Sequence, residues 1–136
     1  MKRLLTVLIL TFVVLSLFSC GDKKSENVTV DDIVNSFDEK VYLPQVYNDE
    51  QIASIYGKLS LSGEILSVIH IVNKSTTPPN LEWTYIYEFS SQEDAVWFEE
   101  NRKEYVSTQE NGQCLRFDKI VVFGNSPVIA DLGSEK

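Results

Sequence analysis

Side chains that could carry out covalent chemistry are few in this chain of 136 residues. The chain has a single histidine, His70, and two cysteines, Cys20 and Cys114. A nucleophilic cysteine needs a base beside it, and no sequence spacing places His70 next to either thiol. The chain has no glycine-rich phosphate loop, no G-x-S-x-G turn, no H-E-x-x-H helix and no cysteine and histidine cluster with zinc spacing. The sequence therefore predicts a protein that is not an enzyme and that carries no metal and no cofactor.

Carboxylates occur in adjacent pairs, which in principle could bind calcium or cleave a glycosidic bond. None of the pairs follows the spacing of a calcium-binding EF-hand loop, and a chain this short leaves little scaffold for a saccharide cleft. We interpret the pairs as solvated helix faces and as partners of helix dipoles. They are Asp31/Asp32, Asp38/Glu39, Asp49/Glu50, Glu93/Asp94 and Glu99/Glu100.

The residues before Cys20 have the three-part layout of an export signal. Lys2 and Arg3 form a positive start, and residues 4–18 are an apolar stretch interrupted by two threonines and one serine. That stretch is shorter than the roughly 20 residues needed to span a bilayer, which disfavours a transmembrane helix. It ends in LFSC, residues 17–20, which is an aliphatic residue, a variable one, a small one and a cysteine. This ending resembles the lipobox of bacterial lipoproteins.

The resemblance implies that Cys20 carries lipid and that the signal peptide is cut between Ser19 and Cys20. Residues 1–19 would then be the signal peptide, residues 20–27 a lipidated polar tether, and residues 28–136 a single small domain. Two or three acyl chains such as palmitate anchor a protein stably, since each buried methylene contributes about 0.8 kcal/mol. The expected location is the extracytoplasmic face of the cell membrane, in either a Gram-positive or a Gram-negative host. The alternative is a plain secretory peptide in which Cys20 is incidental.

Cys114 is the only free thiol once Cys20 carries lipid, so no disulfide can form within the mature chain. The stretch GQCLRFD around Cys114 has the alternation of a strand. It favours a half-buried small side chain over a nucleophile.

The chain is acidic, with 20 aspartate and glutamate residues, 12 lysine and arginine residues and a formal charge of −8. Loss of the signal peptide would remove two basic residues and no acidic ones, so the charge would move to −10. Phosphates are repelled by such a surface, which argues against nucleic acid as a partner. An acidic domain is also repelled by anionic lipid, so we expect contact with the membrane only through the lipid on Cys20.

Three helices are predicted from their start signals. Thr29 is a good cap for a short helix over about residues 30–38. Asn48 begins a second helix of about two turns that stops at Gly57. The third helix has the strongest signal and covers residues 91–106, SQEDAVWFEENRKEYV. Its expected inner stripe is Ala95, Phe98, Tyr105 and Val106.

Alternating apolar residues predict strands in the second half of the chain. Residues 64–73 are nearly continuously apolar, residues 81–89 alternate, and residues 114–124 are typical of two short strands that turn near Asp118. Pro44 interrupts the segment between the first two helices. The order of elements predicts an α+β fold with an antiparallel-dominated sheet of about four strands and helices on one face. Behind a lipobox, this layout resembles the small uncharacterised lipoproteins of Gram-positive bacteria, which adds a location and no chemistry.

Four aromatic residues alternate along residues 81–89 and would share one face of that strand, with Glu88 on the other. This aromatic row is Trp83, Tyr85, Tyr87 and Phe89. Each side chain presents about 150–250 Å², enough either to anchor a core or to form a stacking platform. A domain this small needs large residues inside, so the sequence favours a core position for the row.

Two functions remain open from the sequence. The first, which the demand for core residues favours, is a protein-interaction module of the cell envelope that uses an exposed edge strand or the loop around Pro78 and Pro79. The second is a small-molecule or glycan-binding lipoprotein that presents the aromatic row. Its expected ligand contacts are Trp83, Tyr85, Tyr87, Glu88 and Arg116. A buried Trp83 would support the first function, and an exposed one the second.

Overall fold

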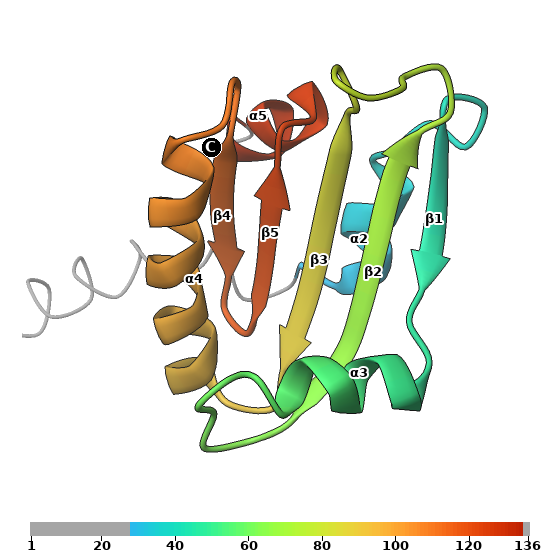
Figure 1. Ribbon diagram of the computed structural model, residues 1–136. Coiled ribbons are helices and arrows are strands. Elements are labelled where there is room, and N and C mark those ends of the chain that lie inside the picture. The colour runs from blue at the N-terminus through green and yellow to red at the C-terminus, as the bar shows by residue number, and fades with distance from the viewer. Residues whose placement is uncertain (1–27, 135–136) are drawn as a thin grey trace, which may run out of the picture.

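The structure, a computed structural model, describes residues 28–134 (Figure 1). The predicted signal peptide, the lipidation site Cys20 and the tether lie outside the described residues. The strands are β1 (Tyr42–Val46), β2 (Ile65–Asn73), β3 (Trp83–Phe89), β4 (Gln113–Phe117) and β5 (Ile120–Gly124). The helices are α2 (Val30–Asn35), α3 (Asp49–Tyr56), α4 (Gln92–Ser107) and α5 (Pro127–Ser134).

The strands form one sheet in the order β1-β2-β3-β5-β4, and every neighbouring pair is antiparallel. The predicted α+β class and antiparallel sheet are confirmed, but the sheet has five strands and not four. The additional strand is β1, which contains Pro44. β4 and β5 form the hairpin predicted from residues 114–124, and Asp118 in its turn has a φ of 52°. Aspartate tolerates this left-handed conformation better than most residues do.

Pro44 is compatible with β1 because β1 is an edge strand. The Tyr47 N–H donates to the Val68 carbonyl just beyond one end of β1. Just before its other end, the Val41 carbonyl accepts from the Lys74 N–H. Odd-numbered residues of this strand therefore direct their backbone groups toward β2, and Pro44 directs its own outward. The free edge thus lacks a donor that an added strand would need.

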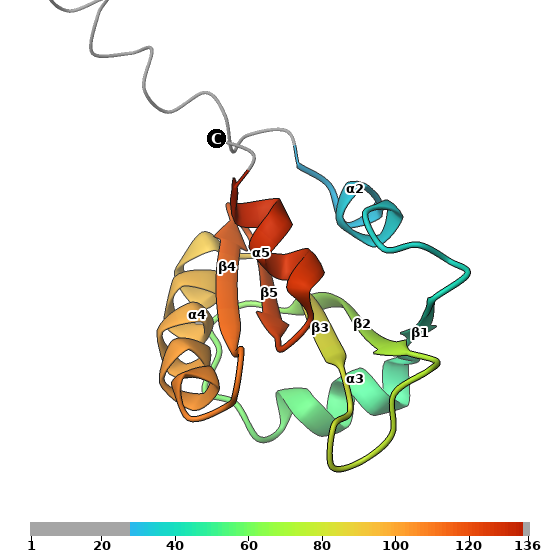
Figure 2. The same cartoon turned by 90° about the horizontal axis from the view of Figure 1, so that it is seen from above.

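Helices lie on both faces of the sheet, where the sequence predicted one face only. Figure 2 shows α2 and α5 on one side of the sheet and α3 and α4 on the other. The physical reason is that the central strands are apolar on both sides. All five residues of β5 are buried, and the buried positions of β2 fall on both faces. The domain is therefore a sheet between two helical layers.

Each face of the sheet has its own hydrophobic core. The buried residues on the α2/α5 face are Ile33, Phe37, Tyr42, Ile69, Ile71, Ile86, Ile120, Val122 and Ile129. Those on the α3/α4 face are Ile65, Val68, Tyr87, Phe89, Ala95, Phe98, Val106, Val121 and Phe123. The second set holds most of the large rings, and it is continuous with the site described below.

The helices begin where their caps predict. Thr29 and Asp32 form a reciprocal capping box at α2, and Asn48 and Gln51 form another at α3. α3 ends before Gly57 as expected, whereas α2 is shorter than predicted and is already closed at Ser36.

Asp94 lies at the start of α4 and is only 4% exposed. Its carboxylate accepts hydrogen bonds from the Ser62 N–H at 2.9 Å, the Ser62 hydroxyl at 3.0 Å and the Gly63 N–H at 2.7 Å. These bonds hold the loop before β2 against the first turn of α4. Since Phe89 pairs with Ile65 directly beside this loop, the contact closes one end of β3.

Candidate functional site

The aromatic row on β3 is buried at one end and open at the other. Phe89 is fully buried and Tyr87 is 7% exposed, whereas Tyr85 and Trp83 are only half-buried. Figure 1 shows the reason: α3 crosses the sheet at the end of β3 that holds Phe89, α4 stands beside β4, and no helix lies in front of the other half of β2 and β3. The core prediction is confirmed for Tyr87 and Phe89, while Trp83 and Tyr85 are accessible as a platform would be.

A cavity of about 430 Å³ opens at the uncovered end of the row. Strands β2, β3 and β5, helix α4 and the segment before β3 all contribute to its walls. The lining residues are His70, Leu81, Trp83, Tyr85, Tyr87, Arg102, Tyr105 and Phe123. We refer to this space as the aromatic cavity.

Ring stacking fixes the floor of the aromatic cavity. The His70 imidazole lies parallel to the Tyr85 ring, with centroids 4.2 Å apart and an interplanar angle of 6°. On its other flank the Tyr85 ring stacks on Phe123 at 5.6 Å, and Trp83 meets it edge-on at 5.8 Å. The three strands place these side chains together because His70, Tyr85 and Phe123 are directly opposite one another in the sheet register.

The side chains of His70, Tyr85 and Tyr87 are neutral at physiological pH. Burial lowers the pKa of His70, so its imidazole is uncharged near pH 7. Burial raises the pKa of Tyr85, and the hydrogen bond with the Tyr47 hydroxyl adds to this effect. Burial likewise raises the pKa of Tyr87 to about 12. These phenol groups keep their protons and can donate hydrogen bonds to a ligand.

Arg102 is the charged residue of the aromatic cavity. Its guanidinium carbon lies 5.0 Å from the centre of the Phe98 ring and 5.7 Å from the centres of the Tyr105 and Phe123 rings. Such cation–π contacts hold the group in place. Within residues 28–134 its buried Nε has no hydrogen-bond partner, and neither ion pair found there involves Arg102.

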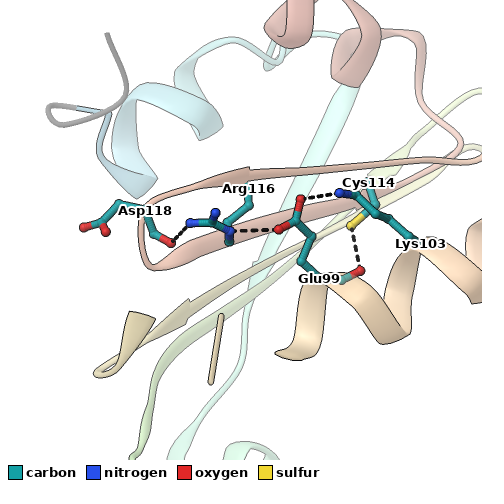
Figure 3. A network of polar contacts seen from close by, with 5 residues as sticks. All are labelled: Glu99, Lys103, Cys114, Arg116 and Asp118. Atoms are coloured by element: carbon teal, nitrogen blue, oxygen red, sulfur yellow. Dashed lines mark hydrogen bonds and ion pairs between the residues drawn. The ribbon is translucent and has the colours of Figure 1, made fainter. Parts of the chain in front are cut away.

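Glu99, one turn before Arg102 on α4, is engaged elsewhere (Figure 3). Its carboxylate accepts from the Lys103 ammonium at 2.7 Å and from the Arg116 Nε at 2.8 Å. Burial raises the pKa of Glu99, but these bonds outweigh it and leave the pKa below its ordinary value. Arg116 also donates to the Asp118 carbonyl at 3.0 Å. The expectation that Arg116 contacts a ligand on the aromatic row is therefore corrected: it ties β4 to α4.

Glu88 is a second correction to the expected site. On β3 it lies between Tyr87 and Phe89 and so faces the opposite side of the sheet. There it accepts a hydrogen bond from the Ser67 hydroxyl at 3.2 Å. A ligand on the aromatic row cannot reach this carboxylate, whereas Trp83, Tyr85 and Tyr87 do line one cavity.

Cys114 is half-buried, as the sequence predicted. Burial raises the pKa of its thiol to about 11, so the group is protonated at neutral pH and is a poor nucleophile. Its Sγ lies 3.8 Å from the Glu99 carbonyl oxygen (Figure 3). His70 lies in the aromatic cavity, where it stacks on Tyr85.

A second cavity, of about 400 Å³, lies on the other face between α2 and β1. Two of its polar groups hold the fold together: the Asp38 carboxylate accepts from the Lys40 N–H, and the Glu39 carbonyl accepts from the Lys74 ammonium. Its lining has two carboxylates and no cation.

Among residues 28–134 no three histidine, cysteine or acidic side chains come together in a way that could hold a metal ion. No helix of that range is long and apolar enough to cross a bilayer.

Sequence reasoning missed five lining residues of the aromatic cavity: His70, Leu81, Arg102, Tyr105 and Phe123. Arg102 had a usable signal, because it follows Ala95 and Phe98 by seven and four residues and so falls within the apolar stripe of α4. Tyr105, which was predicted to point inward, is 47% exposed and forms the rim.

The chain matches no protein-family model, and no curated protein and no solved structure is significantly similar to it. Any function is therefore inferred from the site itself.

Proposed function

We propose that the domain binds a small ligand with a planar or sugar ring in the aromatic cavity. The observation that carries this proposal is the arrangement of Trp83 and Tyr85, two large half-buried rings that line an open cavity of about 430 Å³. Small-molecule sites are typically concave and apolar with a few polar groups that fix orientation. Stacked rings with protonated hydroxyl tips suit a ligand that has both a flat face and hydroxyl or carbonyl groups.

The protein-interaction module of the cell envelope is the less supported function. It required an exposed edge strand or a docking loop, and Pro44 removes an outward donor from the free edge of β1. The side chain of Val46 on that strand is 72% exposed, but it stands at the end of a short edge. The aromatic cavity is a more specific feature than this edge.

We also propose that the domain is held at the extracytoplasmic face of the cell membrane by lipid on Cys20. The support is the layout of residues 1–20: a positive start, an apolar stretch of signal-peptide length and the ending LFSC. Lipid transfer and the lipoprotein-specific cut both need the thiol. Cys20→Ala should therefore leave an unprocessed or a secreted form, seen by fractionation and intact mass. A Cys20→Ala protein that stays in the membrane fraction at the mature mass would disprove the anchor.

The ligand proposal is tested with tryptophan fluorescence. The chain has two tryptophans, and Trp97 is 37% exposed on α4, outside the cavity lining. Trp97→Phe in the full-length protein leaves Trp83 as a single reporter at the cavity mouth. We expect sugars such as the disaccharide of N-acetylglucosamine or methyl glucuronoside to change its emission in a saturable way. Indole, which itself fluoresces, should instead raise the unfolding temperature.

Tyr85→Ala in the same background should abolish that change, because it removes the central ring of the floor. Val46→Ala, on the far edge strand, is the matched control and should leave it intact. If none of the compounds alters the emission or the unfolding temperature at millimolar concentration, ring binding is wrong and the interaction module becomes the better proposal.

A further inference from the structure

Arg102 places a positive charge in the wall of the aromatic cavity, which favours a negatively charged ligand. We infer that the ligand is an acidic sugar, a pyranose ring that carries one carboxylate, and that Arg102 binds this carboxylate. This inference rests on the proposed function, because it concerns the same cavity.

The geometry of Arg102 favours an anionic partner. Phe98, Tyr105 and Phe123 surround the guanidinium at 5.0–5.7 Å and hold its plane, so little side-chain freedom would be lost on binding. Arginine presents its N–H groups as a fork that matches both oxygens of a carboxylate. Arg102 is half-buried and lines the cavity, but its Nε is enclosed by protein, so a carboxylate would meet the terminal N–H groups of the guanidinium.

The acid one turn before Arg102 on α4 is engaged by other residues. A glutamate three residues before an arginine on a helix would ordinarily pair with it. Glu99 holds that position, but Figure 3 shows its carboxylate between Lys103 and Arg116. The interaction that would normally neutralise Arg102 is therefore made with two other cations.

The charge of the whole chain limits the ligand to few negative groups. With a formal charge of −8, the protein repels polyanions such as nucleic acids or heavily charged glycans. One cation in an otherwise uncharged cavity matches one carboxylate. The neutral imidazole of His70 and the protonated hydroxyls of Tyr85 and Tyr87 are then available to sugar hydroxyls, and the open ring of Trp83 to the sugar face.

The experiment compares two ligands that differ at one group: methyl glucuronoside, which has a carboxylate, and its amide, which is neutral and has an NH2 group in place of one carboxylate oxygen. Both are titrated against the full-length Trp97→Phe protein, with Trp83 emission as the readout. We expect the carboxylate form to bind about tenfold or more tightly, as is usual for hydrogen bonds to charged groups. Arg102→Met, which keeps the apolar stem, should abolish the preference for the carboxylate over the amide.

Lys103→Met is the matched control. It removes the same charge from the next residue of α4, but Lys103 is 58% exposed and bound to Glu99. We expect it to keep the preference for the carboxylate. Equal loss of preference in both variants would indicate a long-range charge effect and would overturn the contact with Arg102.

The outcomes separate this inference from the proposed function. If the two glucuronosides bind equally, or if only indole binds, the inference is wrong while ring binding stands. If neither the sugars nor indole binds, ring binding fails as well. The two ligands are first compared on the Trp97→Phe protein, in which Arg102 is present. This comparison does not depend on the Arg102→Met variant, whose folding is checked separately by thermal unfolding.

Discussion

The two ends of the aromatic row have the same residue chemistry and different environments. At the Phe89 end, Phe98 of α4 packs on Phe89 at 5.1 Å and on Tyr87 at 4.6 Å, and the loop held by Asp94 closes the edge. At the Trp83 end the rings pack on one another and on His70, and their outer surface borders the aromatic cavity. One strand with one alternation thus provides both a core and a binding surface, and the position of α4 decides which is which.

Side-chain type alone does not determine which of these aromatic residues are buried. β-strand alternation assigns a face, but a face is buried only where another element covers it. α4 starts three residues after Phe89, and its Phe98 packs on Phe89 and Tyr87. At the Trp83 end α4 contributes Arg102 and Tyr105 to the wall of the aromatic cavity and leaves it open.

The largest expected effect is the loss of the buried ring. Phe89→Ala removes a fully buried aromatic side chain and should lower the free energy of unfolding by about 3–5 kcal/mol. Tyr85→Ala removes a half-buried ring and should cost about 1–2 kcal/mol, chiefly its stacking on His70 and Phe123. Chemical denaturation of the full-length protein measures both. Equal losses would contradict the division of the row into a buried end and an open end.

The carboxylate that closes the buried end gives the next effect. Asp94→Asn keeps the volume but turns an amide donor toward the Ser62 or Gly63 N–H, and should cost about 1–3 kcal/mol. Burial raises the pKa of Asp94, but the hydrogen bonds from Ser62 and Gly63 outweigh it and hold the pKa below its ordinary value. Its contribution to stability is therefore present above the unfolded-state pKa and is lost as the pH falls through the lower pKa of the folded state.

The measurement is urea denaturation of the Asp94→Asn protein and the unsubstituted protein at neutral pH and in the acidic range. The two stabilities should converge as the pH falls, because the unsubstituted protein loses the contribution that the variant lacks. Glu93→Gln, at the exposed neighbouring position, is the matched control and should change little. Curves that run parallel down to acidic pH would show that Asp94 is not the group that titrates.

Local signals allowed much of the fold to be predicted. The caps at Thr29 and Asn48 and the alternation along residues 81–89 act over a few residues, and the structure confirms each of them. β1 could not be predicted because its stability as an edge strand depends on pairing with β2, which a local reading of Pro44 cannot include. The placement of helices on both faces was not predicted for a similar reason, because the apolar residues of a strand do not indicate which element will cover them.

The site was predictable only as far as it lies on one strand. Trp83, Tyr85 and Tyr87 follow from the period of two, but the partners His70 and Phe123 depend on strand register. Arg116 was predicted to contact a ligand, because its actual partner could not be seen in the sequence. That partner, Glu99, lies 17 positions away along the chain. Arg102 was overlooked even though a cation within an apolar helix stripe is itself unusual.

The smallest expected effect concerns His70 at the open end. Burial against Tyr85 lowers the pKa of His70 from its ordinary value of 6.5, so the folded protein favours the neutral imidazole. Between the two pKa values the unfolded chain binds more protons than the folded one, and stability therefore rises with pH there. The contribution is complete above the unfolded-state pKa and is lost as the pH falls through the folded-state pKa.

Because His70 is the only histidine in the chain, its imidazole resonances can be followed by NMR without ambiguity. We expect a midpoint below 6.5, and a His70→Gln protein whose stability changes less between about pH 7.5 and pH 5 than that of the unsubstituted protein. A midpoint at or above 6.5 would mean that water reaches His70 freely and that the imidazole is not held against Tyr85.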